Sequence, residues 1–287
     1  MIQGPDIGEV VMHHTADAYS IGIEPFFSVH WHRWPDVHWL GLTVNLTPTK
    51  HVVFLFIAAI LVFLTMWLTG RALERQRASE RAPTGFANAM ESFVLWVRDD
   101  IAIANIGHGG EKFAPYIMTL FFFILYANLL GLVPHGSTAT GNLAVTSALA
   151  ITAFFTIEVS GLVKLGPKGY LRTIFPPAPG LTGVPAVLMS AAMGPIEVLS
   201  KLVKPVALAI RLFGNMTAGH FAILSLFSLI FLFANLPILP RWGIGLGTSA
   251  IVVGIMMLEI FVAFLQAYVF TLLVSTFIGQ IRTAEAH

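Results

Sequence analysis

The features of this sequence that point most directly to chemistry are a few charged side chains inside long apolar stretches. Between residues 173 and 240 the formal charges are Glu197, Lys201, Lys204 and Arg211. Between residues 242 and 281 there is only Glu259. An ionisable group at membrane depth costs about 3 kcal/mol on insertion scales, so such groups are candidates for function. Carboxylates beside a fixed cation are typical of proton and ion paths.

The charges of the first stretch share one side of a predicted helix. Glu197, Lys204 and Arg211 follow one another at intervals of seven residues. At 100° per residue, each step drifts by only about 20°, so the three form a stripe. Asn215, four residues after Arg211, lies on nearly the same side. Ser200 and Lys204 are secondary candidates on this helix.

A second polar stripe is predicted on the last apolar segment. Glu259 and Gln266 are seven residues apart, which separates them by about 10 Å along a helix axis. Two such stripes would line a path between apolar helices. His220 lies on the side of its helix opposite Arg211, about 13 Å further along, and would contribute to a different wall.

Each of these residues also has a purely structural interpretation. Lys201 and Lys204 lie early in their segment and would snorkel to the interface. In that interpretation, His220 would be an interior histidine whose ring nitrogens are hydrogen-bonded, and Gln266 would form hydrogen bonds between helices. Glu158, near the end of its own segment, is expected to pair with Arg98 or with a lysine. For Arg211 and Glu259 we favour a functional role, because their neighbours are apolar on both sides.

The composition places these residues in a membrane protein. Hydrophobic residues make up 56% of the 287 positions and charged residues 11%, and the mean hydropathy is +0.79. Such a chain cannot cover a soluble surface with polar groups. A net charge of +1 without a basic cluster argues against a nucleic-acid partner. With no cysteine, there is no disulfide framework and no thiolate metal site.

The hydropathy pattern predicts an all-α polytopic fold with five crossings. The spans are expected at about 51–70, 113–134, 143–163, 184–235 and 244–281, with an amphipathic surface helix at about 85–107. Arginines follow the first span and lysines the third, so the positive-inside rule places these ends in the cytoplasm, the N-terminus outside and the C-terminus inside. Residues 48–287 are predicted to form one membrane domain after an external segment, 1–47.

The segment at 184–235 is too long for a perpendicular crossing. As a continuous helix it would extend for about 75 Å. It is expected either to lie strongly tilted in the membrane or to break at Pro195 or Pro205, where a backbone donor is missing. The last segment, at 244–281, is also longer than one crossing requires.

The N-terminal segment is rich in histidine. Six histidines fall within the first 51 residues, including His13-His14 and His30-Trp31-His32. Because no helix or strand is predicted that would align these histidines, we expect no metal site. The segment has no basic start followed by an apolar core, and we expect no cleavable signal peptide. No cofactor is expected.

The string PIEVLSKLVKPVALAIRLFGNMTAGH, residues 195–220, closely resembles the a subunit of bacterial and mitochondrial rotary ATP synthases. LEIFVAFLQAYVFTLL resembles the last helix of that family, and NLLGLVPH, which includes Asn128, is similar to a third region of it. The resemblance covers roughly residues 48–285. Gly131 departs from it, because some relatives have an aspartate there.

The resemblance implies a proton-translocating stator subunit with two half-channels beside a ring of c subunits, each with a buried carboxylate. Arg211 matches the arginine that faces this ring. Asn215 and Gln266 match polar positions near it, Glu197 an acidic position assigned to the inner path, and His220 and Glu259 positions assigned to the outer path. Some members carry the acid and the histidine in the opposite order, and this complementary swap predicts that the two positions are close in the fold.

The resemblance also implies partners and a location. The expected partners are the c ring, the b-subunit peripheral stalk, the soluble catalytic head and membrane lipid. A bacterial inner membrane is expected, with an organellar inner membrane as the alternative. The chain lacks a GxxxxGK[ST] phosphate loop and would not itself be catalytic. A proton- or sodium-coupled secondary transporter and an intramembrane enzyme are the competing interpretations.

Overall fold

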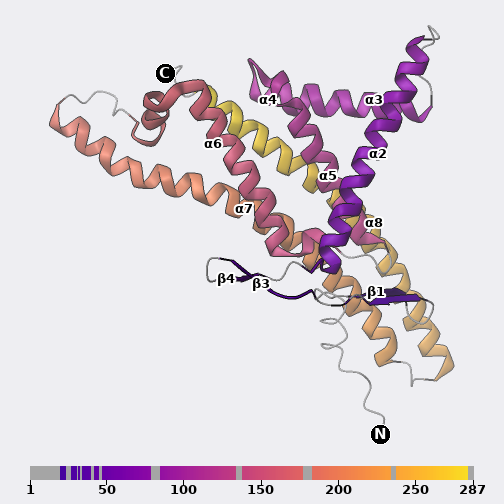
Figure 1. Cartoon of the computed structure of the whole chain (residues 1–287). Coiled ribbons are helices and arrows are strands. Elements are labelled where there is room, and N and C mark those ends of the chain that lie inside the picture. Colours follow the sequence, from indigo (N-terminus) through magenta and orange to yellow (C-terminus); the bar gives the residue numbers. More distant parts are fainter. Residues whose placement is uncertain are drawn as a thin grey trace. The chain divides into compact units, whose positions relative to one another are not determined.

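The structure is a computed structural model, and it describes residues 20–23, 27–30, 32, 34–39, 42–44, 47–78, 85–133, 138–176, 183–233 and 237–283. Long helices dominate it, as Figure 1 shows, and the prediction of a helical polytopic membrane protein is confirmed.

Within the described residues, four helices are long and apolar enough to cross a membrane: α2 (Lys50–Ala78), α5 (Ala114–Leu132), α6 (Leu143–Ile174) and α8 (Ile238–Thr283). They contain the predicted spans at 51–70, 113–134, 143–163 and 244–281, apart from residue 113 and residues 133–134 of the second span. α2 continues past its span into the arginine-rich stretch that begins at Arg71. Alanine, leucine, isoleucine and phenylalanine suit these helices because their apolar side chains can face lipid, where backbone groups must be satisfied within the helix.

The helix α7 (Val184–Leu232) has 49 residues and corresponds to the predicted segment at 184–235. It is one helix through both Pro195 and Pro205, so of the two alternatives the break at a proline does not occur; the tilt in the membrane stays a prediction. A proline removes one backbone hydrogen bond, and the helix around it can retain the others. The crossing of the membrane by α7, and with it the total of five crossings, stays a prediction.

The predicted amphipathic helix at 85–107 is present in three consecutive parts. These are α3 (Phe86–Trp96), a π-helical stretch η1 (Val97–Ile103) and α4 (Ala104–Ile106). Its exposed charges, Arg98, Asp99 and Asp100, lie in the π-helical stretch. The opposite side packs inward, because the Trp96 ring stacks on Tyr268 of α8 at 5.7 Å between centroids. A helix that is charged on one side and aromatic on the other suits a membrane surface.

The N-terminal segment contains β-structure that the sequence did not predict. The strands β1 (Ser20–Ile23) and β2 (Phe27–His30) pair antiparallel, as do β3 (Val37–Trp39) and β4 (Leu42–Val44). Each pair is a short two-stranded hairpin. His13 and His14 lie outside the described residues, and no group of three metal-binding side chains occurs in the described part of the chain.

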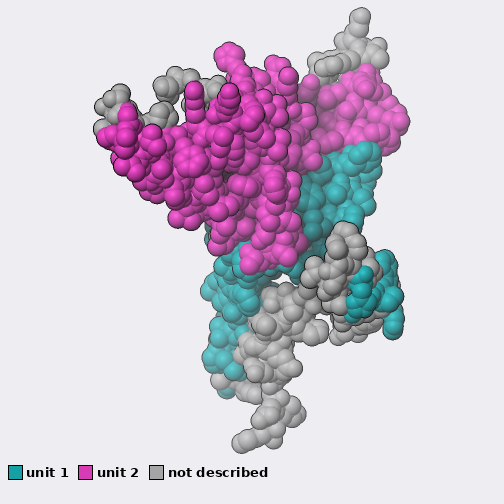
Figure 2. Space-filling model, turned by 60° about the vertical axis from the view of Figure 1, so that its left-hand side comes forward, with its two compact units in different colours: residues 1–64, 123–142, 213–265 teal, residues 65–122, 143–212, 266–287 magenta. Residues whose placement is uncertain are grey.

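The chain divides into two compact units, which Figure 2 colours separately. Unit 1 comprises residues 1–64, 123–142 and 213–265, and unit 2 comprises residues 65–122, 143–212 and 266–287. Both α7 and α8 contribute to each unit, and the boundaries follow Leu212 and Leu265. The prediction of one membrane domain over 48–287 remains a prediction.

A kink divides α6 within unit 2. Gly166 has φ 68°, a backbone conformation that favours glycine, and Pro167 follows it. The chain then resumes helical structure to Ile174. Beyond the kink, the Phe175 ring fills the space beside Gly194 of α7, where an added Cβ would lie 2.3 Å from the ring. The second half of α6 therefore packs on the first part of α7.

Candidate functional site

The candidate residues fall into two sets, one in each unit. Unit 1 contains Asn128, Asn215, His220 and Glu259, and unit 2 contains Glu197, Ser200, Lys204, Arg211 and Gln266. Each set is described within its own unit.

In unit 1, Glu259 of α8 lies directly against α7 at Gly219. A Cβ added to Gly219 would be 1.8 Å from the Glu259 Oε1 atom, so the carboxylate occupies the space that a side chain at this position would need. Glu259 is 8% exposed, and its Oε2 atom is buried without a hydrogen-bond partner among the described residues. Because His220 is the next residue along α7, the close approach expected of the acid and the histidine has direct support in the fold.

The imidazole of His220 is hydrogen-bonded through Nε2 to the hydroxyl of Thr138. Thr138 lies between α5 and the 3₁₀ turn η3 (Ala139–Gly141), so it brings a third segment to this site. Thr217, one turn before His220 on α7, has a buried hydroxyl oxygen that finds no hydrogen-bond partner in the described part of the chain. Two buried oxygens that lack protein partners, one on Glu259 and one on Thr217, are typical of a site that admits water.

Asn128 holds α5, η3 and α8 together in unit 1. Its side-chain amide donates to the Ala263 carbonyl at 3.2 Å, and its Oδ1 accepts from the Thr140 hydroxyl at 2.7 Å. Asn128 and Thr140 are fully buried. With both ends of its amide bonded, Asn128 fixes the turn that carries Thr138.

Gly131 is a glycine because Thr138 occupies the space beside it. An added Cβ would lie 2.4 Å from the Thr138 Oγ1 atom, the same oxygen that bonds His220. An aspartate at this position would collide with that threonine. In this chain, Thr138 therefore occupies the space that a side chain at position 131 would take.

In unit 2, the Arg211 side chain is exposed, and within the described part of the chain it has no hydrogen bond or ion pair. On the same stretch of α7, Leu208, Ala209 and Leu212 are buried, whereas Ile210 is 56% exposed. The guanidinium is therefore held by a packed helix and points away from the core of its own unit. A buried arginine would need an anionic partner within its own chain. Arg211 is exposed instead, and has no such partner among the described residues.

The other unit 2 candidates have different environments. Glu197 is half-buried, and Ser200 is exposed. The Lys204 ammonium lies 4.7 Å from the centroid of the Phe277 ring of α8, a cation–π contact. Gln266 is 4% exposed. Glu259 and Gln266 of the second predicted stripe are therefore both buried. In the first stripe, Arg211 and Asn215 are exposed, whereas Glu197 and Lys204 are half-buried.

Lys201 does not snorkel to the surface. Its ammonium forms an ion pair with Glu158 at 3.3 Å, which confirms the expectation that Glu158 pairs with a lysine and excludes Arg98 as that partner. Arg98 instead lies 3.7 Å from Asp99.

Sequence reasoning missed Thr138, Thr217 and Gly219. The signal for Thr138 was present in the turn sequence HGSTATGN, but its partner lies 82 residues away along the chain. Gly219 is a helical glycine in an apolar stretch, and only the neighbouring helix reveals why it has no side chain.

Apolar helices long enough to cross a membrane, with ionisable residues inside them, are typical of membrane proteins that move ions. The family model of the ATP synthase A chain matches residues 52–279. The chain belongs to this family.

Individual relatives agree with that assignment. The chain is 44% identical over 281 residues to ATP synthase subunit a 2 of Chlorobaculum tepidum, covering 98% of this chain and 74% of the relative. It is 42% identical to ATP synthase subunit a of Pelodictyon phaeoclathratiforme, with 98% and 77% covered. It is 39% identical to ATP synthase subunit a of Anaeromyxobacter dehalogenans, with 95% and 69% covered. These similarities favour this family over a secondary transporter or an intramembrane enzyme.

Proposed function

We propose that this chain, as the proton-translocating a subunit of an F-type ATP synthase, provides two offset half-channels. These channels load and unload the carboxylates of a c ring, and proton flow between them requires the ring to turn. The chain itself is non-catalytic, and ATP is made in the soluble head of the complex. The absence of a phosphate-binding loop from the sequence supports this division of labour.

The exposed, unpartnered side chain of Arg211 is the observation that carries the proposal. A guanidinium in an apolar protein surface has a high energy unless an anion approaches it. The c-ring carboxylate is that anion. Because arginine stays protonated at any accessible pH, it attracts the carboxylate but does not pass a proton from one channel to the other.

The outer half-channel runs through the unit 1 set. Glu259 exchanges protons with the outer side, and His220 and the buried Thr217 and Glu259 oxygens hold the water that brings them. Carboxyl and imidazole groups are the side chains that most often accept and release protons in such roles. Asn215, exposed on α7, helps to orient the approaching carboxylate.

The inner half-channel runs through the unit 2 set, with Glu197 as its proton-exchanging residue. Ser200 and Lys204 contribute polar groups to the same side of α7, and Gln266 stabilises the surroundings of Arg211. The two half-channels are proposed not to join. A continuous path would let protons leak without rotation.

The partners and the location follow from the same assignment. The c ring packs on the exposed apolar side of α7 and α8, and the b-subunit stalk holds the chain in place against rotation. The chain resides in a bacterial inner membrane with its N-terminus outside and its C-terminus in the cytoplasm. Arg71, Arg75 and Lys168 at the inner helix ends support this orientation.

The test is Arg211→Ala in the whole complex, reconstituted into vesicles. ATP-driven proton pumping is expected to fall to background, while all subunits still copurify, because Arg211 is exposed and supports no packing in its own chain. Arg75→Ala, which removes an exposed arginine from α2, is the matched control and should pump normally. Normal pumping by the Arg211→Ala complex would refute the proposal.

A further inference from the structure

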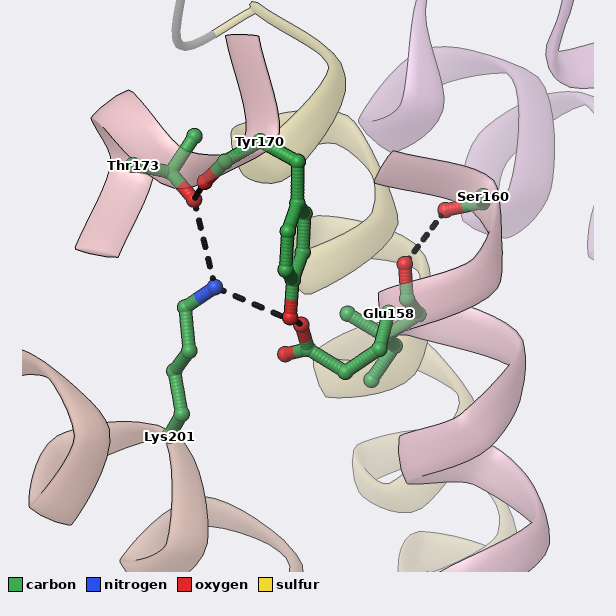
Figure 3. A network of polar contacts seen from close by, with 6 residues as sticks. Glu158, Ser160, Tyr170, Thr173 and Lys201 are labelled. Atoms are coloured by element: carbon green, nitrogen blue, oxygen red, sulfur yellow. Dashed lines mark hydrogen bonds and ion pairs between the residues drawn. The ribbon is translucent and has the colours of Figure 1, made fainter. Parts of the chain in front are cut away.

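A cluster of polar side chains in unit 2 is not used by the proposed proton paths. Figure 3 shows Lys201 of α7 beside Glu158, Tyr170 and Thr173 of α6. The Lys201 ammonium lies 3.3 Å from Glu158 Oε2 and 3.3 Å from Thr173 Oγ1. The Tyr170 hydroxyl donates to the same Glu158 oxygen, and the Tyr170 ring lies 4.6 Å from the ammonium. Three side chains of α6 therefore contact the Lys201 ammonium.

The kink in α6 makes this cluster possible. In a straight helix, Tyr170 would be about 18 Å along the axis from Glu158. The left-handed backbone of Gly166 and the following Pro167 turn the chain, so that Tyr170 and Thr173 approach the first half of the same helix. Phe175 against Gly194 fixes the returning segment on α7.

The ion pair of Lys201 with Glu158 is largely withdrawn from solvent. The side chains are 12% and 14% exposed, respectively. A pair at this depth is costly to break, because removal of one partner leaves a buried charge without compensation. Its geometry is therefore expected to persist while the ring turns.

Glu197 lies four residues before Lys201 on α7, about 40° around the helix. A glutamate four residues before a lysine is the favourable arrangement for an ion pair within one helix. Lys201 is the only cation within one turn of Glu197 on α7. Nevertheless, its ammonium is bound to Glu158, across the gap between α7 and α6.

We propose that Glu158 is a positioning residue of the inner half-channel, which holds the Lys201 ammonium away from Glu197. Glu197 then keeps an unpaired carboxylate that can take up and release protons. If Lys201 paired with Glu197, the ion pair would stabilise the charged carboxylate and hinder its protonation. The inference rests on the proposed role of Glu197.

Among the ionisable groups around Glu197, Lys201 is the cation that would pair with its carboxylate. On α7, Lys204 is two turns away and lies over the Phe277 ring. On α6, Tyr170 and Glu158 belong to the cluster, and Lys164, Lys168 and Arg172 are exposed. The stretch of α8 from Phe270 to Ile281, which contacts Lys204 through Phe277, has no ionisable side chain.

The test measures passive proton flux through inverted membrane vesicles stripped of the soluble head, with the pH varied on one side at a time. In Glu158→Gln, Lys201 is free to pair with Glu197. The midpoint of the flux against cytoplasmic-side pH should then fall by about 1 pH unit, while the dependence on outer-side pH stays unchanged. The double variant E158Q/K201Q has no ammonium to pair and should restore the midpoint.

Further variants separate this role from a general packing defect. Thr173→Val and Tyr170→Phe weaken the hold on the cluster without changing charge, and should shift the midpoint in the same direction by less. Glu111→Gln, the same change at an exposed position of unit 2, should shift nothing. A flux that falls equally at every pH in Glu158→Gln, with no change of midpoint, would overturn the inference.

Glu197→Gln distinguishes this inference from the proposed function. If Glu197→Gln keeps the normal flux and cytoplasmic pH profile, the assignment of Glu197 to the inner path fails, and the inference fails with it. If Glu197→Gln abolishes the cytoplasmic pH dependence but Glu158→Gln leaves the midpoint in place, only the role of Glu158 is wrong.

Discussion

The side chains of Arg211 and Glu259 differ in how far they are exposed. Arg211 is exposed, as a residue must be if it meets a group on another subunit. Glu259 is 8% exposed, with one carboxylate oxygen against Gly219 and the other without a partner. A buried carboxylate with an unsatisfied oxygen is stable only when it is protonated or reached by water. The first environment suits an electrostatic gate, and the second suits proton exchange.

Substitution of Glu259 by glutamine tests the exchange role. Glu259→Gln keeps the size and removes the titration, so transport should slow by roughly tenfold. The remaining flux should also lose the part of its dependence on outer-side pH that Glu259 contributes. Flux through vesicles stripped of the soluble head, measured at a series of outer-side pH values, provides this profile. An unchanged profile would remove Glu259 from the route.

At the scale of elements, glycines let neighbouring segments approach closely. Gly219 of α7 leaves room for the Glu259 carboxylate of α8, and Gly131 of α5 leaves room for the Thr138 side chain. The kink at Gly166 and Pro167 lets one helix supply both halves of the cluster around Lys201. In a membrane, where helices gain little from burying apolar surface, close approach of this kind is a main source of specific packing.

Gly219→Ala tests the contact between these helices. The new methyl group would need the space of the Glu259 Oε1 atom, so the carboxylate must move, at a cost of about 1–3 kcal/mol. We expect proton flux to fall by about fivefold or more. Gly70→Ala in α2, where no atom lies within 4 Å of the added Cβ, is the control and should transport normally. Equal flux in both variants would show that the position of Glu259 is not critical.

At the scale of the whole molecule, much of the apolar surface of α7 and α8 is exposed in the isolated chain. Ile196, Leu199 and Ile210 on α7 and Met257 on α8 are each more than half exposed. Lipid or a partner must cover such surface. Because Arg211 lies on the same helix as the first three, the c ring is the partner that we expect near Ile210.

Cross-linking tests this arrangement directly. The chain has no cysteine, so Ile210→Cys places its only thiol beside Arg211. It should form a disulfide with a cysteine placed next to the c-subunit carboxylate. Phe63→Cys in α2, which is 66% exposed as a phenylalanine, is the control and should not. Failure of Ile210→Cys to cross-link in an assembled complex would contradict the proposed ring-facing surface.

Much of this protein was determined by its sequence alone. Four of the spans, the surface helix at 85–107 and the family could be predicted, because they depend on local hydropathy, charge and a distinctive string of residues. The tertiary structure decided the rest. It placed Glu259 against Gly219, gave His220 its partner Thr138 and turned Lys201 toward Glu158 rather than toward Glu197. These choices depend on which helices touch and at what height, and no periodicity within one helix contains that information.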